Sequence, residues 1–166
     1  MRSVCRAAAV LLTCILATGP LGAQRRNPAR DVTIPGTDLV VQPGWLLLQR
    51  DGCWFTVPLG WKAAASGNAF DGPDGSTLLV RRLQFSDWTA HIARTTRTLG
   101  SRSTVRDDTT QHLWIETRQA DVVEEYAEAR LDDGSCSLVL RYSTSGILSR
   151  DAARQIVRSL APVRLR

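Results

Sequence analysis

The segment from Gly52 to Trp88 constrains the fold of this chain more than any other. In Cys53–Val57, alternate side chains fall on opposite faces of a strand, and Pro58 ends that strand because proline lacks a backbone donor. The turn Asp71–Gly75 follows, where glycine supplies the positive φ that a tight turn needs. It leads into a second apolar run, Thr77–Phe85. The segment therefore predicts antiparallel strands joined by tight turns and followed by a helix.

Two main helices are predicted. The first begins after Ser86, an N-cap residue, and ends at Gly100. The second begins after Ser149 and stops at Pro162. Each carries an apolar stripe at helical spacing, which is formed by Trp88, Ile92 and Leu99 in the first helix and by Ala152, Ile156 and Leu160 in the second.

Further strands are predicted at His112–Gln119 and Cys136–Thr144, and a hairpin joins Trp45–Leu48 to the strand that follows it. Val122–Leu131 fits either a solvent-facing strand or a helix, because it carries three glutamates. Ser101–Gln111 is a polar stretch between elements. Short connections without regular alternation of strand and helix predict an α+β fold, in which an antiparallel sheet is flanked by two main helices.

Residues 1–23 have the layout of a signal peptide, with two arginines, an apolar run and then small residues. The apolar run is shorter than the roughly 20 residues that a membrane span needs, so no permanent span is expected. We expect cleavage between Ala23 and Gln24; the alternative is lipidation at Cys14. Residues 24–36 are then a flexible leader and residues 37–166 a single domain, in an exported protein of the periplasm or the extracellular space.

The body of the predicted domain is slightly acidic, and the basic pI of the chain comes from its tails and signal peptide. Loss of Arg2 and Arg6 leaves 19 basic against 16 acidic residues, and residues 31–163 hold 14 basic against the same 16. Phosphate neutralisation supplies most of a nucleic-acid binder's affinity. The charge balance therefore disfavours nucleic acid as a partner.

Cys53 and Cys136 are the two cysteines that remain after the signal peptide is removed. Each follows a glycine-containing turn and shares a strand face with apolar residues. An even pair in an oxidising compartment favours a disulfide, which requires Cα atoms within about 7 Å. The alternative is a pair of buried free thiols.

The run Phe55–Trp61, the turn Asp71–Gly75, the helix start Ser86–Trp88 and the closing run Ile156–Leu160 resemble the PsbP-like and DcrB-like families of exported bacterial domains. The resemblance covers most of residues 52–163. It implies an antiparallel sheet sandwiched by helices, and a role without enzymatic activity as an accessory or adaptor subunit in envelope or photosynthetic complexes. It identifies no catalytic residues in this chain. The chain differs from these families in having an extra strand region, Asp38–Gln49, and two cysteines after the signal peptide is removed.

Trp45, Trp54 and Trp61 are the candidate ligand or partner surface, because exposed indoles stack on ligands and anchor interfaces. Trp54 lies opposite the face of Cys53 and is the best candidate for exposure. The alternative is that a helix covers this second face and buries Trp54.

No cofactor, metal site or catalytic residue is predicted. His91 and His112 lack zinc-ligand spacing and are expected at the surface or a sheet edge. The oxygens of Asp71–Ser76 fit a turn better than a calcium loop. The leading hypothesis is a non-enzymatic exported domain that binds a protein partner in the cell envelope. The second is a carrier or sensor of a small apolar or glycan ligand, and the third is a cryptic hydrolase that uses His112 and the neighbouring Asp107 and Asp108.

Overall fold

The computed structural model describes residues 32–33, 40–65, 67, 69–100 and 102–162. The predicted signal peptide with its Ala23/Gln24 cleavage site, and the predicted leader apart from Val32–Thr33, lie outside these residues. Val32–Thr33 (β1) pairs antiparallel with Val40–Val41 (β2), so strand pairing extends into the region predicted as leader.

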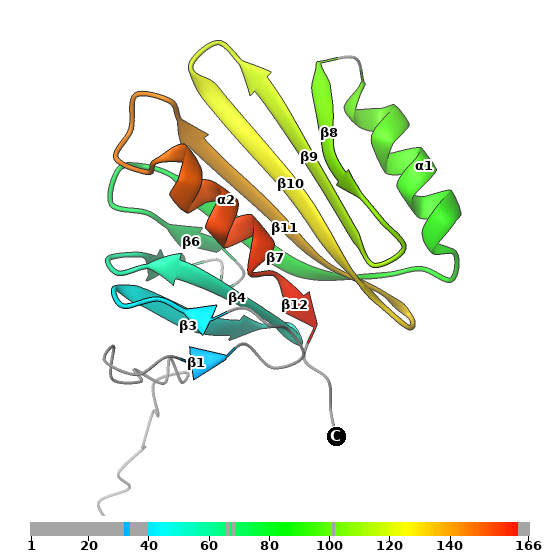
Figure 1. Cartoon of the computed structure of the whole chain (residues 1–166), viewed down its shortest axis with the longest axis horizontal. Coiled ribbons are helices and arrows are strands. Elements are labelled where there is room, and N and C mark those ends of the chain that lie inside the picture. The colour runs from blue at the N-terminus through cyan, green and yellow to red at the C-terminus, as the bar shows by residue number, and fades with distance from the viewer. Residues whose placement is uncertain (1–31, 34–39, 66, 68, 101, 163–166) are drawn as a thin grey trace, which may run out of the picture.

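The chain folds as α+β, as predicted, around a seven-stranded antiparallel sheet (Figure 1). The strand order is β5-β6-β7-β11-β10-β9-β8. In chain order the strands are β5 Lys62–Ala63, β6 Ala69–Asp71, β7 Thr77–Gln84, β8 Ser103–Asp108, β9 His112–Gln119, β10 Val122–Leu131 and β11 Gly134–Ser143. The strand predicted at His112–Gln119 is confirmed with its bounds, and the ambiguous Val122–Leu131 is a strand.

The polar stretch Ser101–Gln111 contains an edge strand, β8, that the sequence did not predict. β8 pairs with β9 alone, and all of its residues except Ser103 are exposed. A strand that is paired on one side and solvated needs no apolar periodicity. That is why the pattern of its residues gave no signal.

A smaller sheet and helix α2 cover one face of the large sheet. The smaller sheet has the order β12-β4-β3, with β3 Trp45–Arg50, β4 Cys53–Pro58 and β12 Ala161–Pro162. The predicted β3–β4 hairpin is confirmed. Helix α2, Arg150–Arg158, contacts β10, β11 and β4 and lies over the sheet in Figure 1. The main core between these layers contains fully buried side chains from every one of them, including Phe55, Val57, Leu138, Leu140 and Ile156.

Helix α1, Trp88–Leu99, packs against the opposite face of the sheet, where Trp88 and Ile92 meet Leu113 and Ile115 of β9. Gly100 ends the helix with a φ of 71°, as predicted. The predicted N-cap Ser86 is wrong by one residue, because the Asp87 carboxylate accepts the hydrogen bond from Ala90 N at 3.0 Å.

Ser149 caps α2 as predicted, since its Oγ accepts a hydrogen bond from Ala152 N. The helix ends at Arg158, before the predicted stop at Pro162. Ser159 turns the chain there, because its Oγ accepts from Thr56 N at 2.7 Å and donates to Ile156 O. The residues that follow pair with β4 as β12.

The predicted disulfide between Cys53 and Cys136 is confirmed, with the Cα atoms 5.6 Å apart. It joins the start of β4 in the small sheet to the start of β11 in the large one. The two strands begin at the same end of the molecule, which is the condition that the bond required.

Candidate functional site

An apolar groove of about 300 Å³ lies where three connections meet. These are the chain after β4, the β6–β7 turn and the loop between β11 and α2. We call it the tryptophan groove. Its apolar lining is Trp45, Leu59, Trp61, Ile147, Leu148 and Ala152, together with Pro58 and Pro73.

Asp74 holds two of these connections together. Its Oδ1 accepts a hydrogen bond from Ser76 N at 3.1 Å, and its Oδ2 accepts one from Leu148 N at 2.9 Å. Burial of the carboxylate opposes its ionisation, but the hydrogen bonds outweigh burial and lower the pKa of Asp74. The ionised side chain thus fixes the β6–β7 turn to the β11–α2 loop.

The rim of the groove exposes two large aliphatic side chains. Leu59 is 52% exposed and Ile147 is 79% exposed. Fully burying a side chain of this kind is worth about 1.5–3 kcal/mol. Adjacent exposed apolar side chains around a groove are typical of an interaction surface. Neither residue was a sequence candidate, because a single Leu or Ile in a turn is ordinary until the fold shows which residues surround it.

The structure brings together two of the three candidate tryptophans. Trp45 is half-buried and Trp61 is buried, and both line the groove. Trp61 packs closely against the β6–β7 turn, where a Cβ on Gly72 would be only 3.0 Å from Trp61 Cζ2. The lack of a side chain at Gly72 favours this close contact.

Trp54 belongs to a separate cluster. It is half-buried, and it packs with Val41 and Ala161. The predicted exposure of Trp54 is therefore only partly realised. Its cover comes from β2 and β12, whereas the alternative hypothesis expected a helix.

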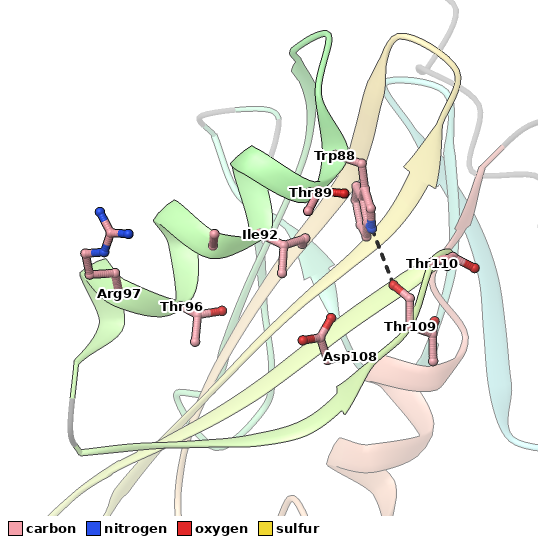
Figure 2. Close-up of a pocket in the computed structure, with 9 residues that line it drawn as sticks. Trp88, Thr89, Ile92, Thr96, Arg97, Asp108, Thr109 and Thr110 are labelled. Atoms are coloured by element: carbon pink, nitrogen blue, oxygen red, sulfur yellow. Dashed lines mark hydrogen bonds between the residues drawn. The ribbon is translucent and has the colours of Figure 1, made fainter.

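A wider groove of about 750 Å³ runs between α1 and the end of β8 (Figure 2). Trp88 turns from the helix towards the strand, and its Nε1 donates to Thr109 O at 3.3 Å. Threonines dominate the rest of the lining, with Arg97 from the helix and Asp108 from the strand. This groove is more open than the tryptophan groove, and four threonines together with Arg97 and Asp108 interrupt its apolar surface, so it would enclose an apolar side chain less completely.

His112 and Asp107 line a third groove, of about 270 Å³. His112 is exposed, as expected. Among the described residues that line this groove there is no Ser, Thr or Cys side chain. The groove therefore brings the histidine and a carboxylate together without a hydroxyl or thiol side chain among the lining residues that the structure describes.

Glu128 is buried, although the sequence suggested a solvated position. It lies on the α1 side of β10, where Tyr126 Oη and Ser135 Oγ donate to its carboxylate. His91 Nε2 lies 2.8 Å from Glu128 Oε1, and the His91 ring stacks on Phe85 at 3.9 Å between centroids. The expected surface position of His91 is only partly realised, because its side chain is 19% exposed and ties α1 to the sheet.

Glu125 is buried on the opposite face of the same strand. Trp114 Nε1 donates to it at 2.7 Å and Tyr142 Oη at 3.3 Å. Burial raises the pKa of Glu125, although the hydrogen bond from Trp114 works against the rise. The small residues Ala127 and Ala129 on the same face are the sequence signal that this side of β10 is covered.

Within the described residues, no helix is long and apolar enough to cross a membrane. The same residues contain no group of three or more His, Cys, Asp or Glu side chains placed to hold a metal ion. No protein-family model matches this sequence, and no curated protein is significantly similar to it.

Proposed function

We propose that this chain is a non-enzymatic exported domain that binds a protein partner in the cell envelope through the tryptophan groove. The observation that carries the proposal is the rim of the groove, where Leu59 and Ile147 stand exposed beside Trp45. A few anchors packed in a desolvated pocket, with tryptophan prominent among them, supply most of the free energy of protein association.

The size of the groove favours a protein side chain over a carried small molecule. Ligand pockets measure about 300–1,000 Å³ and enclose most of the ligand surface. The tryptophan groove is at the lower limit, at about 300 Å³, and it is open to solvent. One or two apolar side chains of a partner would fill it.

Export is supported by two observations. Disulfides persist in oxidising compartments, and Cys53–Cys136 is such a bond. The first 23 residues have the order of charge, apolar run and small residues that export signals share. The resemblance of Phe55–Trp61 and the later motifs to PsbP-like and DcrB-like domains points to the same accessory role.

The test is site-specific photo-cross-linking in the envelope of the host. A photoreactive phenylalanine analogue at Ile147 should join the chain to one protein, whereas the same analogue at the exposed Ala90 on α1 should not. The purified partner should then bind the natural chain and lose about tenfold or more in affinity for Ile147→Asp, since burying the Ile147 side chain alone is worth about 1.5–3 kcal/mol. Equal cross-linking from both positions would refute the assignment of the groove. If native mass spectra show a small molecule bound to the natural protein but not to Ile147→Asp, the carrier hypothesis would be favoured instead.

A further inference from the structure

Three arginines converge on one buried carboxylate beside α2. Glu116 of β9 is 3% exposed. Arg118 Nε lies 2.6 Å from its Oε1, and Arg106 and Arg150 each place one nitrogen within 3.1 Å of its oxygens. The arginines come from β9, β8 and the first residue of α2. One guanidinium would neutralise Glu116, so the cluster keeps two positive charges that this carboxylate does not compensate.

The three guanidinium groups remain accessible. Their side chains are 34%, 50% and 43% exposed for Arg106, Arg118 and Arg150. Each guanidinium has five N–H donors, and the contacts with Glu116 use one nitrogen of each. The unused donors are suited to the oxygens of a further carboxylate, which arginine binds in a bidentate manner.

Two more arginines extend the positive charge along α2. Arg150, Arg154 and Arg158 are spaced by four residues and so follow one side of the helix over about 12 Å. Arg158 lies over the Trp114 ring, 5.6 Å from its centroid. We call the five residues Arg106, Arg118, Arg150, Arg154 and Arg158 the arginine strip.

Few acidic groups oppose the strip. Asp151 lies 3.6 Å from Arg154 and is 93% exposed, where an ion pair contributes little. Asp107 shares a groove with Arg158 at one end. Glu125 is the cross-strand neighbour of Glu116, and burial shifts the pKa of Glu125 upwards, against ionisation. The charge excess therefore persists at the centre of the strip.

We propose that the arginine strip binds an acidic segment of a protein partner, whose carboxylates pair with Arg106, Arg118 and Arg150. Arg150, Arg154 and Arg158 alone extend over about 12 Å, which is longer than a single phosphate group. A ligand with several carboxylates along an extended chain would reach more of these arginines at once. A single-stranded nucleic acid would also need aromatic stacking surfaces. Trp114, the aromatic side chain beside these arginines, is buried under Arg158.

This inference rests on the proposed function, because it names the chemistry of the protein partner. The two proposals nevertheless fail separately. The strip is tested with a synthetic peptide and involves neither Leu59 nor Ile147. Cross-linking at Ile147 reports on the tryptophan groove whether or not the peptide binds.

The experiment is a titration of the purified protein into fluorescein-labelled octaglutamate, followed by fluorescence anisotropy. The natural protein should bind at low salt and release the peptide at about 0.3 M NaCl, because exposed charges are then screened. The double variant Arg118→Gln/Arg154→Gln should bind about tenfold more weakly, since each exposed charge-assisted contact is worth about a factor of three. The matched control Arg94→Gln/Arg102→Gln removes the same charge from exposed positions in and after α1, and should change affinity less than about twofold.

Three results would overturn the proposal. The first is that the natural protein does not bind octaglutamate at low salt. The second is an equal loss in the control and in the strip variant, which would show attraction to net charge alone. The third is that phosphatidylglycerol vesicles or oligothymidine bind in a strip-dependent manner while octaglutamate does not, which would identify another class of partner. If the double variant unfolds, Arg154→Glu replaces it, because Arg154 makes no contact with Glu116 and its charge reversal should weaken binding to a similar degree.

Discussion

Glu116 and Glu125 are directly opposite each other on neighbouring strands, yet they should respond in opposite ways to replacement by glutamine. Both carboxylates are buried. Three arginines bond to Glu116, whereas Glu125 meets only the neutral donors of Trp114 and Tyr142. The groups that bond to each carboxylate, and not its depth of burial, should decide how replacement by glutamine changes stability.

For Glu116, the magnitude follows from its pKa. Burial alone would raise this pKa, but hydrogen bonds from Arg106, Arg118 and Arg150 outweigh burial and lower it from 4.5 to about 2. Because the folded pKa lies below the unfolded one, the stabilisation is present above about pH 5 and is lost as the pH falls towards about 2. A shift of one unit is worth about 1.4 kcal/mol, which gives a ceiling of about 3 kcal/mol. Glu116→Gln should lose about 2–3 kcal/mol at neutral pH and show a flatter acid dependence.

For Glu125, the sign is reversed. Burial raises its pKa above the ordinary carboxyl value, so ionisation costs stability as the pH rises through the interval between the unfolded and the folded pKa. Glutamine keeps an oxygen that can accept from Trp114 Nε1 and has no charge to bury. Glu125→Gln should therefore leave stability at pH 7 unchanged or raise it.

The assay is urea unfolding followed by tryptophan fluorescence, repeated between about pH 3 and pH 8. Asp132→Asn, at an exposed turn position, controls for the loss of one negative charge. If acid lowers the free energy of unfolding of Glu116→Gln as much as that of the natural protein, the three arginines do not stabilise the fold through Glu116. An equal loss of stability at pH 7 in both glutamine variants would refute the argument as a whole.

Three further predictions concern stability. Replacing both Cys53 and Cys136 by alanine opens a loop with a sequence separation of 83 and should lower the free energy of unfolding by up to about 4–5 kcal/mol; a loss below about 1 kcal/mol in urea unfolding would contradict this. Gly134→Ala should cost at least about 3 kcal/mol, because the added Cβ would lie 1.8 Å from Leu83 O. Gly75→Ala, which meets nothing within 4 Å, should cost only about 1 kcal/mol through its positive φ, and equal losses would exclude the clash as the cause. Asp87→Ala should cost about 1 kcal/mol by removing the α1 cap, whereas Ser86→Ala should be neutral; thermal melts showing the reverse order would restore Ser86 as the cap.

The sequence predicted the elements whose signals are local. Alternation located β9, glycine-rich turns located the β3–β4 and β6–β7 connections, and Ser149 and Gly100 located two helix ends. The N-cap of α1 was missed because Ser86 and Asp87 are both good caps. The hydrogen bond from Ala90 N to the Asp87 carboxylate decides between them, and it is a feature of the folded chain.

The buried glutamates were missed for a different reason. Alternation in β10 places Glu125 on one face and Glu128 on the other, and a charged residue on a strand is ordinarily solvated. Both faces are covered, by α2 on one side and by α1 on the other. The hydrogen-bond partners that make burial tolerable are Trp114 of β9, Tyr142 and Ser135 of β11, and His91 of α1, so they come from three elements other than β10. No pattern within a single strand contains that information.

Helix α2 determines how the two proposed surfaces are arranged relative to each other. Its N-terminal region contributes Ser149 and Ala152 to the tryptophan groove, and Arg150 to the arginine strip. Hydrogen bonds fix it at both ends, from Leu148 N to Asp74 and from Thr56 N to Ser159. The helix therefore cannot move towards one surface without breaking contacts that shape the other. A partner segment that crosses the β11–α2 loop would meet an apolar groove on one side and guanidinium groups on the other, so we expect apolar side chains next to a run of carboxylates in that segment.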